Sequence, residues 1–156
     1  MSNVNQITTT QITFAIKECV CSHFAFTDFG QSNKVKIEPD KFLFNFSFNL
    51  EVKQEISSVV INLSIDINAN TDSIKDKIAE IKSLNVFHVL NLENIVKKGD
   101  RGIDVPNDLI APLLSISLSN LRGMVSVKFE KSLYTNVVVP IIDATQFLPK
   151  PITTLG

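Results

Sequence analysis

Between Lys41 and Lys53 apolar and polar side chains alternate almost residue by residue, and this pattern restricts the fold more than any other feature of the sequence. One set of positions is apolar and rich in phenylalanine: Phe42, Phe44, Phe46, Phe48, Leu50 and Val52. The residues between them are polar or charged, apart from Leu43. Successive side chains of a strand point to opposite faces, so the segment predicts a long strand with one face in the core.

The same alternation predicts three more strands. The first covers Ile12–Phe26, with its apolar residues mainly at even positions and with Glu18 and Ser22 as interruptions. Another covers Ser58–Ala69, where isoleucine, leucine and valine alternate with polar residues. We assign Ala79–Leu92 to a fourth strand, although the apolar residues around its start also keep helical spacing. Three long strands require a further pairing partner, which favours the strand interpretation.

From Asn107 to Lys128 the spacing of apolar residues becomes that of a helix. Pro106 and Asn107 provide a suitable start signal for it. Pro112 lies beyond the first turn and has no backbone N–H to donate, so we expect the helix to begin later or to kink there. The segment before it, Lys97–Gly102, has the charge and glycine content of a loop, and Val137–Phe147 is a short apolar segment.

These elements predict an α+β protein: a four-stranded antiparallel sheet with a C-terminal helix packed on it. A chain of 156 residues fits one domain and can bury a substantial core. We expect a flexible N-terminal tail over residues 1–11, a single domain over residues 12–149 and a C-terminal tail over residues 150–156.

Charge and composition exclude several classes of function. A formal net charge of −1 disfavours binding to nucleic acid or to a membrane surface, both of which favour a basic face. We find no run of about 20 apolar residues, so membrane insertion is not expected. The polar N-terminal residues lack the pattern of a signal peptide, and we therefore expect a cytoplasmic protein. Five glycines form no phosphate-binding loop, so no cofactor is expected.

Cys19, Cys21 and His23 share one face of the predicted first strand and are the best candidates for metal ligands. Zinc needs three or four convergent ligands, which a straight strand does not supply, and His88 would have to come from another strand. A nucleophilic pair of either cysteine with His88 is the catalytic alternative. Packing explains such strand residues better, so we predict neither a metal site nor an enzyme.

One helix cannot cover both faces of four long strands. The chain has eleven phenylalanines, which bring large apolar area without a polar group that needs a partner. The Phe-rich strand therefore fits a sheet core, but part of the apolar surface is expected to meet another chain. That contact is either a subunit interface or a groove for a client polypeptide.

The order of the elements, together with two C-terminal segments, resembles the SecB-like chaperones. The helix carries SLSNLRGMVSVKF, and NVVVPIIDATQFL follows it. Arg122 and Gly123 match an Arg-Gly element near the end of the family helix. Pro140, Asp143 and Phe147 match the proline-containing segment that leads to an aromatic residue.

This resemblance implies a homotetramer, a dimer of dimers, that holds unfolded or extended polypeptides without ATP, including preproteins for export. By matching position, Phe147 would line the client groove; Phe42, Phe44 and Tyr134 join it as candidates from their face and location. Family members that dock the export motor carry acids on the outer sheet face, whereas this chain has Cys21, Ser22 and His23 there, so docking is in doubt.

Two alternatives stay open at the level of sequence. One is a dedicated client, such as an antitoxin in a chaperone-assisted toxin system. The other is an oligomeric structural or scaffold protein of the same fold, which buries its Phe-rich face permanently and holds no client.

Overall fold

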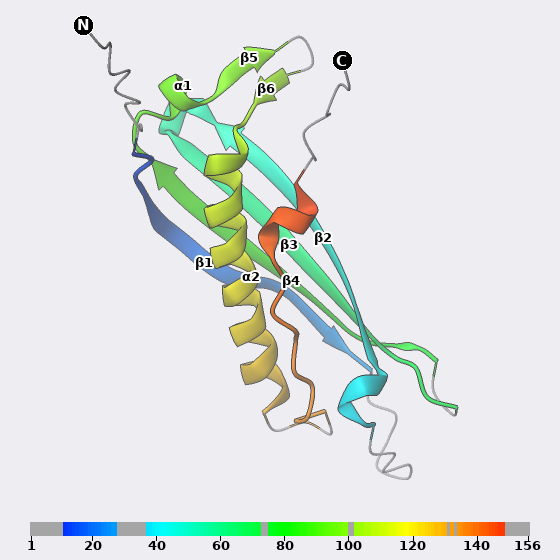
Figure 1. Cartoon of the computed structure of the whole chain (residues 1–156). Coiled ribbons are helices and arrows are strands. Elements are labelled where there is room, and N and C mark those ends of the chain that lie inside the picture. The colour runs from blue at the N-terminus through cyan, green and yellow to red at the C-terminus, as the bar shows by residue number, and fades with distance from the viewer. Residues whose placement is uncertain are drawn as a thin grey trace, which may run out of the picture.

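The computed structural model describes residues 11–27, 37–72, 75–99, 102–130, 132 and 134–148. The predicted tails therefore lie outside the described residues, except for Gln11. Four strands form one antiparallel sheet in the order β1-β4-β3-β2, and a long helix, α2, lies on one face of it (Figure 1). These elements are β1 (Phe14–Phe26), β2 (Phe42–Lys53), β3 (Ser58–Ala69), β4 (Lys77–Val89) and α2 (Asn107–Phe129). The predicted fold class is confirmed.

Shorter elements connect the long ones. They are η1 (Pro39–Lys41), η2 (Gln54–Ile56), α1 (Leu92–Ile95), β5 (Lys97–Gly99), β6 (Gly102–Asp104) and η3 (Ala144–Phe147). Two predictions need correction here. β4 ends at Val89, because Asn91 takes a left-handed conformation with φ 56° and Leu92 then opens α1. The predicted charged loop forms the ladder of a small hairpin, β5–β6, instead.

The core lies between α2 and the face of the sheet that it covers. The even residues of β2 and the odd residues of β3 point toward the helix, as the alternation predicts. The buried apolar residues of α2 fall on one helical face, mostly three or four positions apart: Leu109, Leu113, Leu114, Leu118, Leu121, Val125 and Phe129. Each such side chain stabilises the fold by about 1.5–3 kcal/mol relative to an exposed one, so this interface fixes where the helix sits.

Pro112 does not interrupt α2. The helix begins at Asn107 with Pro106 as its N-cap residue, and it continues through Pro112 to Phe129. The expectation of a later start is therefore wrong. Packing explains why the helix persists, because Leu109, Leu113 and Leu114 on both sides of the proline are fully buried.

β1 is not a uniform strand. Its register with β4 shifts between Ile16 and Glu18 and again between Cys21 and His23. Each bulge reverses which residues face the helix. Glu18 and Ser22, the polar interruptions in the sequence, are thus the residues that a bulge turns to the outer face. The prediction that all even-numbered residues of this strand share one face is therefore wrong.

After α2 the chain runs back alongside the helix on the same side of the sheet, as a returning segment, residues 137–148, that is irregular up to Asp143 and then forms η3 (Figure 1). Arg122 Nε donates to the carbonyl oxygen of Val139 at 3.2 Å, which ties this segment to the helix. At the beginning of the return, the Tyr134 hydroxyl donates to the carbonyl oxygen of Thr27 at 2.9 Å. The segment thereby lies next to α2 and the end of β1.

By length and composition alone, α2 could cross a membrane, since it has 23 residues and an apolar window with a mean hydropathy of 1.3. This is weak support for a membrane span, because the core helix of a soluble protein passes the same test. One third of the window is buried in the single chain. Part of the apolar character of α2 is thus explained by its packing on the sheet.

Candidate functional site

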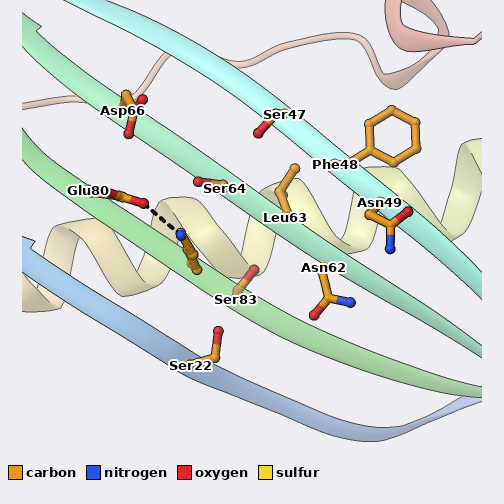
Figure 2. A pocket seen from close by; sticks show the side chains of 11 residues that line it. Ser22, Ser47, Phe48, Asn49, Asn62, Leu63, Ser64, Asp66, Glu80 and Ser83 are labelled. Atoms are coloured by element: carbon orange, nitrogen blue, oxygen red, sulfur yellow. Dashed lines mark ion pairs between the residues drawn. The ribbon is translucent and has the colours of Figure 1, made fainter.

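The sheet face away from α2 carries a hollow with a volume of about 450 Å³. Figure 2 shows that all four strands contribute side chains to it, with α2 behind the sheet in this view. Most of the side chains that line it are polar: Ser22, Ser47, Asn49, Asn62, Ser64, Asp66, Glu80 and Lys82. An open polar surface of this kind offers hydrogen bonds, but few pockets for apolar side chains.

The charges in this outer hollow are paired. Lys77 Nζ lies 3.2 Å from Asp66 Oδ1 and 2.9 Å from Glu80 Oε2, and Lys82 Nζ lies 2.8 Å from Glu80 Oε1. Hydrogen bonds from Lys82 and then Lys77 lower the pKa of Glu80 to about 2. The Glu80 carboxylate therefore stays ionised at neutral pH, and two lysines of the same strand balance its charge.

A second surface lies on the helix side, and we call it the helix-side apolar surface. It consists of Phe46 and Phe48 of β2, Phe147 of η3, and Val138, Ile141 and Ile142 of the returning segment. The ring of Phe147 packs edge-to-face on Phe46 and Phe48, with centroid distances of 6.3 and 6.1 Å. Val138 is 72% exposed and Ile141 is 83% exposed. Ile141 thus projects into solvent next to the half-buried ring of Phe46, and Val138 does so three residues earlier on the returning segment.

Two small hollows adjoin this surface. One, of about 60 Å³, lies between Phe46, the Ser115–Ser119 side of α2 and Ile141. The other, of about 160 Å³, lies between Val125 and Ser126 of α2 and the returning chain at residues 137–139. Arg122 lines both hollows. Both hollows therefore combine aliphatic side chains and serine hydroxyls with one cation.

The four residues predicted to bind a client are distributed between the core and this surface. Phe147 is part of the helix-side apolar surface, and Phe44 is half-buried on the same side of β2. Phe42 and Tyr134 are each 5% exposed and belong to the core. In the single chain a client would reach these two only after a rearrangement, and the role of all four stays a prediction.

Sequence reasoning did not single out Ile141, Val138 or Arg122 as site residues. Alternation could not find the first two, because they lie in a segment without strand or helix periodicity. A usable signal existed, however. Five aliphatic residues surround Pro140, and a short irregular segment cannot bury all of them against the helix. In the structure, Val138 and Ile141 are the ones exposed to solvent.

The structure separates the predicted metal-ligand candidates. Cys19 and Cys21 pair with Asn85 and Ser83 on the helix-facing side of β4, whereas His23 pairs with Lys82 on the outer side. The bulge between Cys21 and His23 is the reason, so the predicted common face is wrong. Partial burial raises the pKa of the Cys19 thiol, which disfavours the thiolate that binds metals. Within the described ranges, no three His, Cys, Asp or Glu side chains could hold a metal ion.

The alternative catalytic pair of a cysteine with His88 is not assembled either. His88 lies opposite Ala15 and Ser58 in the sheet, on the outer side, whereas Cys19 and Cys21 lie on the helix side. A nucleophile and its base must be within hydrogen-bonding reach, and the sheet separates these side chains.

No protein-family model matches the sequence, and no curated protein matches it. Among solved structures the chain is similar to the SecB-like chaperone Rv1957 of Mycobacterium tuberculosis, in complex with a ChAD peptide from the HigA1 antitoxin. The TM-score is 0.51 at 10% sequence identity, and the match covers 83% of this chain and 87% of that one. The fold is SecB-like. At this identity the similarity concerns the SecB-like fold alone, and the function must be argued from the site.

Proposed function

We propose that this protein is a chaperone that binds unfolded or extended polypeptides on its helix-side apolar surface, without ATP. The observation that carries the proposal is the exposure of Ile141, at 83%, next to Phe46, whose ring packs with Phe147. Val138, on the same returning segment, is 72% exposed. The SecB-like fold supports it, since Rv1957 with this fold is a chaperone in complex with a peptide.

The chemistry of this surface suits a client without a fixed structure. Burying one Ile or Phe side chain contributes about 1.5–3 kcal/mol, so a few apolar contacts can hold a chain while each stays replaceable. Extended segments also present backbone groups, and β2 is an edge strand of the sheet, with β3 as its neighbour. A client can therefore combine apolar contacts with hydrogen bonds to the sheet edge.

The proposal includes a homotetramer, a dimer of dimers, in the cytoplasm. Support for assembly comes from β1, an edge strand on which Ile16, Val20 and Phe26 are each 40–50% exposed. An exposed edge strand with apolar side chains tends to aggregate with other chains. A specific contact with another subunit would cover the strand and prevent this. A stable oligomer that buries β1 would leave the helix-side apolar surface for the client.

A dedicated client such as an antitoxin is the second form of the proposal. Two observations favour it over export. The peptide in the Rv1957 complex comes from an antitoxin. On the outer face, Asp66 and Glu80 are paired with lysines, which reduces the negative charge available to a docking motor.

The test is whether a substoichiometric amount of the protein stops a chemically unfolded test protein from aggregating, measured by light scattering. We expect suppression by wild type, a clear loss with Ile141→Asp, and wild-type behaviour with Ile56→Asp. Ile56 is the matched control, because it is also an exposed isoleucine, at 57%, but lies in η2. An intact oligomer without suppression would contradict the general chaperone and favour a scaffold or a single dedicated partner.

A further inference from the structure

Arg122 lies where the two hollows of the helix side meet. Its side chain lines the hollow next to Phe46 and Ile141 and also the hollow next to Val125 and Val138. It is the one charged side chain among the described residues that line either hollow. Aliphatic side chains next to a half-buried cation keep water away from it, which strengthens its attraction for an anion.

Only one N–H donor of the Arg122 guanidinium forms a hydrogen bond within the described residues. Its Nε donates to the carbonyl oxygen of Val139 at 3.2 Å, and no ion pair joins it to a carboxylate within the described ranges. A guanidinium has five N–H donors, arranged in a planar fork that matches a carboxylate. The Nε bond holds this fork against the returning segment, and donors of the terminal nitrogens stay free for a ligand.

The nearest acid along the returning segment has another task. Asp143 is exposed, and its Oδ1 accepts from the backbone N–H of Thr145 at 2.9 Å, which caps η3. The same hydrogen bond lowers the pKa of Asp143. The Asp143 carboxylate is thus engaged in capping η3. Among the described residues, no carboxylate forms an ion pair with Arg122 at the hollows.

We infer that Arg122 makes the chaperone selective for client segments of the form aliphatic-x-acidic-x-aliphatic. This inference rests on the proposed function and names the chemistry that the same surface recognises. In an extended chain, alternate side chains point the same way, about 7 Å apart. The two aliphatic side chains then enter the hollows on either side, and the Asp or Glu carboxylate between them pairs with the Arg122 guanidinium. A lysine at the central position is repelled.

The experiment compares three fluorescent peptides that differ only in the central residue, Asp, Asn or Lys, with leucines two residues to each side. Binding to the whole protein is measured by fluorescence anisotropy. We expect wild type to bind the Asp peptide about five- to tenfold more tightly than the Asn peptide, as one charge-assisted hydrogen-bonded pair would give. The Lys peptide should bind most weakly.

Variants assign this preference to Arg122. In Arg122→Gln the Asp and Asn peptides should bind equally, and Arg122→Lys should keep part of the preference. The matched control is Lys128→Gln, which removes an exposed cation of the same helix that lines neither hollow; it should keep the full preference. Circular dichroism checks folding, and wild type with three peptides decides even if Arg122→Gln does not fold.

The outcomes separate the two claims. If wild type binds the Asp and Asn peptides equally well, the inference about Arg122 is wrong and the chaperone proposal stands. The same conclusion follows if Arg122→Gln folds and retains the preference. If wild type binds none of the three peptides, the inference fails, and the aggregation assay decides separately whether the chaperone proposal stands.

Discussion

Asn85 lies in the middle of β4, fully buried beneath α2, and it joins the sheet to the helix through polar contacts. Its Nδ2 donates to Ser83 Oγ at 3.2 Å, and its Oδ1 accepts from Asn120 Nδ2 of α2 at 3.2 Å. Apolar contacts alone would allow a helix to slide along a sheet, whereas a satisfied polar pair fits only one register. At the residue scale, Asn85 therefore helps to determine which side chains of α2 line the helix-side hollows.

We expect Asn85→Ala to lower the free energy of unfolding by about 1–3 kcal/mol, because Ser83 and Asn120 lose a buried partner. Urea unfolding measures the change. Asn62→Ala is the control, since Asn62 is exposed on the outer face of the adjacent strand β3. The control should change the same quantity by no more than about 0.5 kcal/mol. Equal effects of the two substitutions would contradict a structural role for the buried network.

At the scale of elements, β2, β3 and α2 follow from their apolar periodicity, and β1 shows where such reasoning stops. The sequence predicted β3 with its observed bounds and β2 within one residue. The helical spacing bounded α2 equally well, but the expected later start at Pro112 was wrong. In β1 two bulges shift the register, at points that depend on pairing with β4. A bulge is a feature of two strands together, so the alternation of one strand shows only its interruptions, at Glu18 and Ser22.

Pro112 provides a test at the same scale. It is the sixth residue of α2, beyond the first turn, so its missing N–H leaves a helical carbonyl without its usual donor. We expect Pro112→Ala to raise the free energy of unfolding by about 1–2 kcal/mol, less than the full difference in helix propensity because proline also restricts the unfolded chain. Thermal unfolding measures it. A lowered melting temperature would mean that the packing of the proline ring outweighs the lost hydrogen bond.

For the whole molecule, the two faces of the sheet differ in chemistry. The outer face is a polar hollow with paired charges, whereas the helix side combines exposed aliphatic side chains, half-buried rings and one unpaired guanidinium. A polypeptide client fits the second better than the first.

The fold class could be predicted from the sequence, but only part of the candidate site could. Phe147 was found through its place in a motif, and it lies in the helix-side apolar surface. Phe42 shares a strand face with Phe44 and Phe46, and alternation cannot tell that Phe42, at the end of the strand, is the buried one. Ile141 and Arg122 become site residues only because the returning segment lies beside α2, and this is a tertiary contact.

The central claim is that an extended client lies on the helix-side apolar surface, and site-specific photo-crosslinking tests it most directly. A photoreactive residue replaces Ile141 in one variant and Ile56 in another, and an unfolded polypeptide is added before irradiation. Our account predicts a covalent product with the client from position 141 and little or none from position 56. Crosslinking from position 56 alone, or from neither position while the protein still suppresses aggregation, would show that the client binds elsewhere.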